Sequence, residues 1–304
     1  MNIIRTIVPC LAIPIITMLG IGLFASLLSP VFWSILHGEY VLEKVFQKTG
    51  LLLLTLSAIY CVRTSVFHPQ SGIFESTLPE QLKWLASSWL IGVLILSIPL
   101  TILIALQIRI PDTEVLASTT SVAKKLIAPL LVGLLVALIE EYVFRGWLLG
   151  WLQSRFAEIK SFGQNLAIVT SAFYFAILHF LKPAVELNNQ NSTLQASLDV
   201  FFRSLKHLFQ HNDIDTLIAL FLAGVLLAII KIRFNHGLLL VIGIHAGWIF
   251  SIKTIKSLTH GNPASQWQYL VGQDGIVGYL SASWLALVVL GLIIFFGFQN
   301  KQHD

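Results

Sequence analysis

Three ionisable residues lie inside an apolar stretch of the chain, LVALIEEYVFRGWLLGWL, which runs from Leu135 to Leu152. They are Glu140, Glu141 and Arg145. Each charge at the centre of a bilayer costs about 3 kcal/mol on insertion scales, so charges in such a stretch are paired or lie near water. Glu141 and Arg145 are four residues apart, which on a helix places them on one face and allows an ion pair. Glu140 points away from that pair, so its carboxylate is available for chemistry.

Two histidines occur in similarly apolar surroundings on other segments. His179 lies in FYFAILHFLKP, one turn after Phe175, and His245 lies in LLLVIGIHAGWIF among small residues. A single histidine of this kind is more often a packing residue than a catalyst, and charges near a helix end can extend to the membrane surface. One glutamate and two histidines on three apolar segments are harder to explain by packing alone. We expect Glu140, His179 and His245 to meet around one hydrated cavity.

The chemistry that suits this set is the activation of water, by either of two mechanisms. In one, Glu140 is a general base for water that attacks a peptide carbonyl, while the histidines orient the water, stabilise the oxyanion and protonate the leaving amine. In the other, Glu140, His179 and His245 bind zinc and leave an open position for water. The sequence contains no HExxH helix, the commonest signature of zinc proteases.

Successive motifs resemble those of the CPBP family, the CAAX protease and bacteriocin-processing enzymes, also described as type II CAAX prenyl endopeptidase-like or Abi proteins. The motifs are EEYVFRG, FAILH and FLAGVLLAIIKIRFNHGLLLVIGIHAG, and the resemblance covers about residues 126–253. It implies an all-helical bundle with an intramembrane site. Its members are described both as metalloproteases and as metal-free glutamate proteases, and we favour the metal-free form for this chain, with zinc as the alternative cofactor.

The resemblance also implies a role for each matching residue. Glu140, His179 and His245 match the catalytic residues. Glu141 and Arg145 match a structural and orienting pair, and Phe175 matches a packing aromatic. One position departs from the family pattern, because Ile249 stands where an Asn or another polar residue usually follows the last histidine by four positions. Losing one oxyanion donor costs about 3 kcal/mol of barrier. Lys182 or Lys253 is a candidate for a compensating charge.

The segments that must position these residues are apolar and helical. A membrane span needs about 20 apolar residues, and the sequence offers eight candidates. They are 7–29, 49–67, 84–106, 126–152, 166–182, 216–233, 237–253 and 276–298. Pro99 and Pro129 are expected to kink their helices. The fold class expected is therefore an all-α polytopic membrane bundle. We divide the chain into N-terminal spans (1–125), a catalytic core (126–253), and a loop with a C-terminal span (254–304).

One connecting segment has a different pattern. In LQASLDVFFRSLKHLFQH, residues 194–211, Leu and Phe recur at helical spacing with polar and charged residues between them. This pattern predicts an amphipathic helix. We expect it to lie in the membrane interface, and the alternative is a helix packed on the bundle or on a partner.

The composition supports a membrane protein. Of 304 residues, 56% are hydrophobic and 11% are charged, with a net charge of +4, whereas a soluble domain carries about a quarter charged residues. The scattered Lys and Arg residues do not indicate nucleic-acid binding. We expect a multi-pass protein of the plasma (inner) membrane whose partners are the lipid bilayer and a membrane-associated peptide or protein substrate.

The function expected is an intramembrane endopeptidase that hydrolyses a peptide bond in that substrate. A non-catalytic scaffold or resistance factor of the same fold is the alternative that Ile249 favours. A proton-coupled transporter, with the Glu and His residues as a relay, is the third hypothesis. Transporters of that kind show inverted repeats, and none is visible in the sequence.

Overall fold

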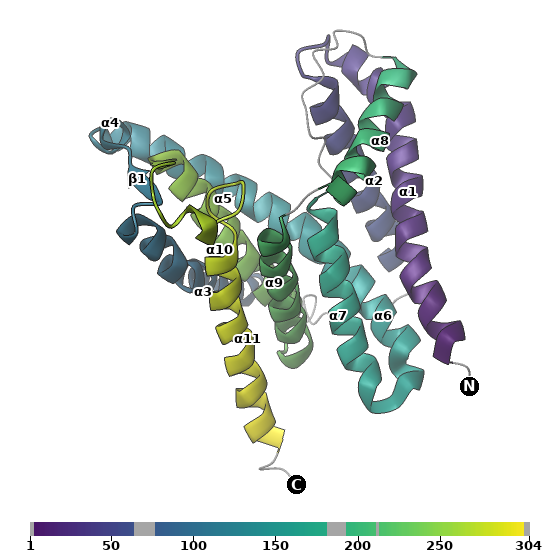
Figure 1. Ribbon diagram of the computed structural model, residues 1–304. Helices are drawn as coiled ribbons and strands as arrows, with labels where there is room; N and C mark the ends of the chain where they lie inside the picture. The colour runs from purple at the N-terminus through teal and green to yellow at the C-terminus, as the bar shows by residue number, and fades with distance from the viewer. Residues whose placement is uncertain (1–2, 64–76, 181–192, 211–212, 301–304) are drawn as a thin grey trace. The chain divides into compact units, whose positions relative to one another are not determined.

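A computed structural model describes residues 3–63, 77–180, 193–210 and 213–300 of the chain, and these are almost entirely helical (Figure 1). The described residues divide into two compact units. The first unit comprises Met1–Pro69 and Trp147–Asn212, and the second comprises Gln70–Gly146 and Asp213–Asp304. Each unit is described by itself below. Both are built from two separate stretches of sequence. The division into 1–125, 126–253 and 254–304 follows chain order and stays a prediction of where the catalytic core lies.

The expectation of an all-α membrane bundle is confirmed. Six of the described helical segments are long and apolar enough to cross a membrane. They are Ile7–Ile35, Leu78–Ala105, Thr119–Phe156, Ile214–Arg233, Gly237–Leu258 and Tyr279–Gly297. The count of eight is not confirmed, because the candidates at 49–67 and 166–182 are not among the six. Their last residues, 64–67 and 181–182, lie outside the described residues. The protein is an integral, multi-pass membrane protein.

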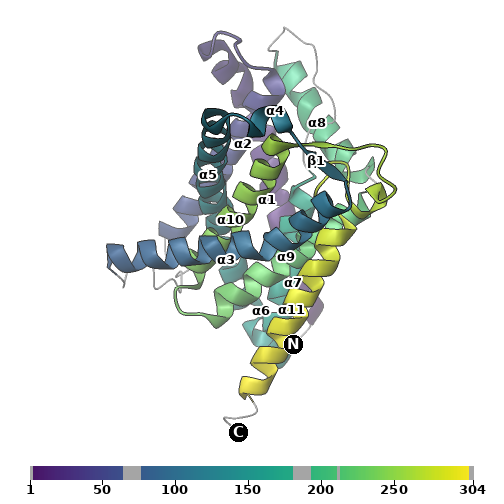
Figure 2. The ribbon, with the colours of Figure 1, turned by 90° about the vertical axis from the view of Figure 1, so that its left-hand side faces the viewer.

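The second unit contains most of these spans. Its helices are α3 (Leu78–Ala105), α4 (Thr113–Leu116), α5 (Thr119–Glu141), α9 (Ile214–Arg233), α10 (Gly237–Leu258) and α11 (Tyr279–Asn300). Helix α10 is the most deeply buried and packs against α3, α5 and α9. Figure 2 shows α3 crossing α5 and α10 steeply.

Glycines allow the helices of the second unit to approach closely at α10. A Cβ atom at Gly92 of α3 would overlap the Ile244 carbonyl oxygen of α10, and one at Gly247 would overlap the Trp89 carbonyl oxygen of α3. On the side of α5, a Cβ atom at Gly133 would lie 2.9 Å from the Ala246 carbonyl oxygen. Small residues are what bring membrane helices into backbone contact. These two crossings fix the position of α10 on either side of residue 245.

A proline and a tryptophan tie α11 to α3. Pro99 lies inside α3 and has no backbone N–H, so the Ile95 carbonyl one turn earlier loses its usual helical donor. The Trp284 indole Nε1–H of α11 donates to that carbonyl oxygen over 2.7 Å. Because a buried carbonyl without a donor is costly, Trp284 stabilises the helix at the position where Pro99 weakens it.

The loop ends of α3 and α10 meet in a small sheet that the sequence did not predict. Strand β1 (Arg109–Pro111) pairs antiparallel with β2 (Thr259–Gly261), although residues 259–275 have the composition of a loop. The Arg109 guanidinium donates to the Thr259 hydroxyl over 2.6 Å and to its carbonyl oxygen over 2.7 Å. Burial lowers the pKa of Arg109, and the nearby Asp274 carboxylate partly offsets this. This pairing joins the ends of the two helices that cross at Gly92.

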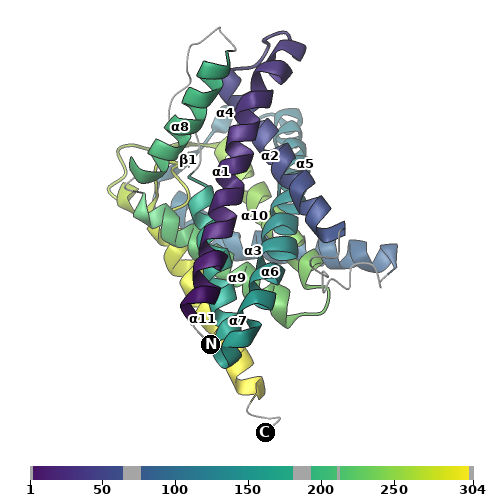
Figure 3. The ribbon, with the colours of Figure 1, turned by 90° about the vertical axis from the view of Figure 1, so that its right-hand side faces the viewer.

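The first unit is built around α1 (Ile3–Ile35), which packs against α2 (Leu42–Arg63) and α8 (Leu194–Gln210), as Figure 3 shows. Its other helices are α6 (Leu149–Phe156), the short 3-10 turn η3 (Ala157–Ile159) and α7 (Lys160–Leu178). The Tyr174 hydroxyl of α7 donates to the Leu11 carbonyl oxygen of α1. The amphipathic segment predicted at 194–211 is therefore a helix through residue 210 that packs on the bundle. Its location in the membrane interface stays a prediction.

Candidate active site

The two glutamates are the last residues of α5, and the helix continues directly into a π-helix, η2 (Tyr142–Leu148). The one glycine in this stretch, Gly146, has ordinary space around it and is not placed there by a close contact. A π-helix is a wider turn of backbone and occurs frequently at functional sites. Arg145 lies within it. No pattern in the sequence predicted this change in helical geometry.

Glu141 and Arg145 form the buried ion pair that their spacing predicts. The Arg145 Nη1 donates to Glu141 Oε1 over 2.9 Å, and both side chains are fully buried. The Arg145 Nη2 also donates to the Gly224 carbonyl oxygen of α9 over 3.2 Å. Breaking such a pair by removing one partner costs about 3–5 kcal/mol, because the other charge is then left uncompensated in the interior. The pair therefore holds α9 against the end of α5.

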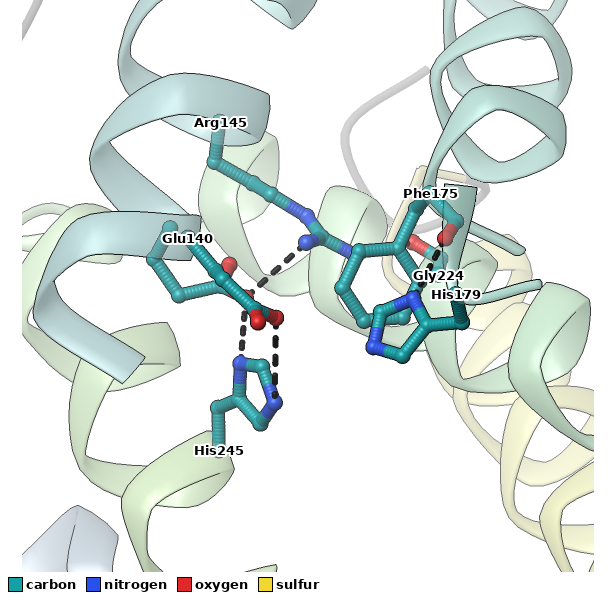
Figure 4. A network of polar contacts seen from close by, with 7 residues as sticks. Glu140, Arg145, Phe175, His179, Gly224 and His245 are labelled. Carbon is teal, nitrogen blue, oxygen red and sulfur yellow. Dashed lines mark hydrogen bonds and ion pairs between the residues drawn. The ribbon is translucent and has the colours of Figure 1, made fainter. Parts of the chain in front are cut away.

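His245 contacts the same carboxylate from α10. Its Nδ1 lies 2.7 Å from Glu141 Oε1 (Figure 4). An ionised carboxylate only accepts hydrogen bonds, so Nδ1 carries the hydrogen and Nε2 of a neutral imidazole carries the lone pair. The sequence predicted Glu141 as the partner of Arg145 alone. Because residues 141 and 245 are 104 positions apart, no local pattern reveals that Glu141 also orients His245.

Glu140 lies near the other ring nitrogen of His245. Its Oε2 is 3.9 Å from His245 Nε2, which is too long for a direct hydrogen bond. The Glu140 side chain is 23% exposed, whereas the Glu141 side chain is 0% exposed. The adjacent glutamates therefore have different environments, one in contact with Arg145 and His245 in the interior and one beside the outward nitrogen of the imidazole. The structure thus brings together four of the six predicted residues.

His179 and Phe175, the other two, belong to the first unit. His179 caps the end of α7, and its Nδ1 lies 2.6 Å from the Phe175 carbonyl oxygen. The two rings are in contact, with centroids 4.5 Å apart. Since a carbonyl only accepts, Nδ1 is again the protonated nitrogen and Nε2 is the one available for chemistry. The convergence of His179 with Glu140 and His245 stays a prediction.

Residues 122–251 match a family model, described as type II CAAX prenyl endopeptidase Rce1-like. This segment is therefore similar to the type II CAAX prenyl endopeptidases of that family. The matched range contains all six predicted residues and agrees with the range of about 126–253 over which the motifs resemble that family. No curated protein and no solved structure shows significant similarity to the chain.

The position at which the chain departs from the family pattern is apolar in the structure too. Ile249 is half-buried on α10, and its Cβ lies 3.6 Å from where a Cβ at Gly133 would be. An isoleucine in this position supplies no hydrogen-bond donor. Lys253, one turn further along, is exposed. Lys182 lies outside the described residues.

A metal site is not formed by the donors that the structure describes. Among them, no group of three or more His, Cys, Asp or Glu side chains has the arrangement to hold an ion. Within the second unit, the Oε1 atom of Glu141 already contacts both Arg145 and His245. Of the three ligands expected for zinc, Glu140 and His245 lie in the second unit and His179 lies in the first, so a zinc ion with three protein ligands stays the alternative prediction.

Proposed function

We propose that the protein is an intramembrane endopeptidase that hydrolyses a peptide bond of a membrane-associated peptide or protein. The observation that carries this proposal is the set Glu141, His245 and Glu140, in which a buried carboxylate contacts one imidazole nitrogen and a second carboxylate lies 3.9 Å from the other. A carboxylate that fixes the tautomer of a histidine, with the opposite nitrogen facing the reacting groups, is a recurring arrangement in hydrolases.

The attacking water belongs between Glu140 and His245. A water about 2.8 Å from each of two polar atoms can bridge them when they are too far apart to bond directly, and Oε2 and Nε2 are 3.9 Å apart. Glu140 accepts a proton from this water while the Nε2 lone pair orients it, and the water oxygen adds to the peptide carbonyl carbon. Proton transfer by a positioned general base contributes about 10²–10⁴-fold to a rate.

The two glutamates have different roles in this proposal: Glu141 orients His245, and Glu140 transfers the proton. Arg145 donates to Glu141 Oε1, and the same oxygen accepts from the His245 Nδ1–H, so Glu141 holds the imidazole in place. Glu140 gives its proton to the leaving amine, and this breaks the tetrahedral intermediate. We propose His179 as the group that stabilises the oxyanion, in the role that a polar residue at position 249 would otherwise share. For this its ring carries a hydrogen on both nitrogens, so that Nδ1–H bonds the Phe175 carbonyl oxygen and Nε2–H donates to the oxyanion.

The first test is cleavage by the protein reconstituted in liposomes. The family description names CAAX prenyl endopeptidases, so a prenylated CAAX peptide is the first substrate to supply. We expect Glu140→Gln to reduce kcat by at least about 10²-fold, since it removes the general base. Glu114→Gln removes an exposed carboxylate of the same unit and is the matched control. Full activity of the Glu140→Gln variant would refute the proposal. Metal analysis and a chelator arm decide between the metal-free and zinc mechanisms.

The half-buried Ile249 favours one alternative, a non-catalytic scaffold of the same fold. The two proposals predict different outcomes for the same variant. A scaffold keeps its cellular phenotype when Glu140 becomes Gln, because the substitution leaves the shape and the ion pair of the site in place. An endopeptidase loses the phenotype although the variant protein is folded and inserted. The plasma membrane remains the proposed location.

A further inference from the structure

Helix α8 packs on α1 through small residues. A Cβ atom at Gly22 of α1 would overlap the Phe201 ring, and the Ser26 hydroxyl donates to the Ser197 carbonyl oxygen over 3.5 Å. The face of α8 that these contacts bury is mostly small. It comprises Ala196, Ser197, Val200, Phe201 and Ser204. Residue numbers rise along α1 as they fall along α8, so the two helices run antiparallel. Figure 3 shows α8 beside the half of α1 that is nearer to Ile35.

These contacts fix how deep the charged residues of α8 lie relative to α1. The apolar segment of α1 that can cross a membrane is Ile7–Ile35. A span of about 20 residues placed anywhere within it always includes residues 16–26. Asp199 lies between Ser197 and Phe201, and it is therefore level with residues between Gly22 and Ser26. Arg203 is half a turn beyond Phe201. Both charged side chains are exposed.

The opposite side of α1 at the same level is apolar and exposed. Leu23 is 44%, Phe24 is 55% and Leu27 is 51% exposed. Such a surface on an apolar helix belongs in lipid, so this half of α1 lies within the bilayer. A charge in hydrocarbon costs about 3 kcal/mol on insertion scales, and charged residues at this depth therefore face water or the bundle interior. The polar face of α8 cannot share the lipid environment of the outer face of α1.

We propose that the polar face of α8, with Asp199 and Arg203 at its centre, lines a water-filled groove that reaches into the membrane. The two side chains have opposite charge and are four residues apart, a spacing that lets them form an ion pair on one face of α8. Lys206 and Gln195 extend the same exposed face along the helix. The groove gives an amphipathic helix a place beside a membrane span without burying its charges. It does not depend on the proposed peptidase activity.

Cysteine labelling tests the groove directly. In a variant without native cysteines (Cys10→Ala and Cys61→Ala), single cysteines replace Asp199 or Arg203. Matched controls replace Leu23 or Phe24, which lie at the same depth on α1. Each protein is reconstituted in liposomes, and a charged, membrane-impermeant maleimide is supplied on both sides. We expect the α8 cysteines to react and the α1 cysteines to stay unmodified until detergent is added.

Two outcomes would overturn the proposal. If the α8 cysteines are as protected as the α1 controls, lipid or protein covers the polar face. If both sets react alike, this half of α1 lies outside the bilayer and no groove is needed. If a charge substitution impairs folding, Gln195→Cys tests the same face without removing a charge. A thermal melt of each variant checks that it is folded.

Discussion

Pro99 removes a backbone donor from the interior of α3, and the Trp284 indole supplies a replacement to the Ile95 carbonyl oxygen. Trp284→Phe keeps an aromatic ring in place and removes the donor. A hydrogen bond is worth about 1 kcal/mol net, and a buried carbonyl left without a donor costs about 1–3 kcal/mol. Pairs between membrane helices average about 0.6 kcal/mol, with a maximum near 1.7. We therefore expect Trp284→Phe to lower the free energy of unfolding by about 1–2 kcal/mol.

The proline makes this expectation testable by a double-mutant cycle. Pro99→Ala restores a backbone N–H four residues after Ile95, and α3 can then satisfy the Ile95 carbonyl within its own helix. In this background we expect Trp284→Phe to cost less than about 0.5 kcal/mol. The assay is denaturant unfolding in mixed micelles for the wild type, both single variants and the double variant.

A control variant and a refuting result complete the experiment. Trp84 lies on α3 and is 41% exposed, so Trp84→Phe should change the unfolding free energy by less than about 0.5 kcal/mol. If Trp284→Phe costs the same in both backgrounds, the indole does not substitute for the missing backbone donor. Gly92, at the crossing beside Ile244, is only three residues from Ile95, so loss of this bond should also disturb the position of His245.

Two further predictions concern packing in the second unit. Arg145→Met should lower the free energy of unfolding by about 3–5 kcal/mol, because it leaves Glu141 buried without its counter-charge. The double variant with Glu141→Gln should be more stable than Arg145→Met alone. A less stable double variant in denaturant unfolding would contradict the buried-charge argument. Gly92→Ala should cost about 1–3 kcal/mol through overpacking against α10, whereas Gly291→Ala, at a position with open space around it, should cost almost nothing in the same assay.

The local half of the site could be predicted from sequence. The spacing of Glu141 and Arg145 lies within one helix, where four residues always place two side chains on one face, and the ion pair is present. The contact between Glu141 and His245 joins α5 to α10, and it depends on crossings at Gly92 and Gly133 that leave no periodic signal in the sequence. Prediction therefore separated the two glutamates but did not reveal that Glu141 also orients the histidine.

The same limit applies to α8 and to α3. The Leu and Phe pattern identified an amphipathic helix, but the structure buries small residues against α1 and leaves Leu194 and Phe202 exposed, because close helix contact in membranes selects small side chains. In α3, a kink was the expected effect of Pro99. Its compensation by Trp284 could not be foreseen, since the donor lies on a helix 189 residues away from Ile95.

The order of the contacts around Arg145 has a consequence for how the protein is made. Gly224 and His245 follow Arg145 and Glu141 in the chain by 79 and 104 residues. The helix with the two acids is therefore synthesised and delivered to the bilayer before its later partners exist. Only the counter-charge one turn away on the same helix is present at that moment. The ion pair that later orients the histidine thus first neutralises one of the two acids as the nascent segment enters the lipid.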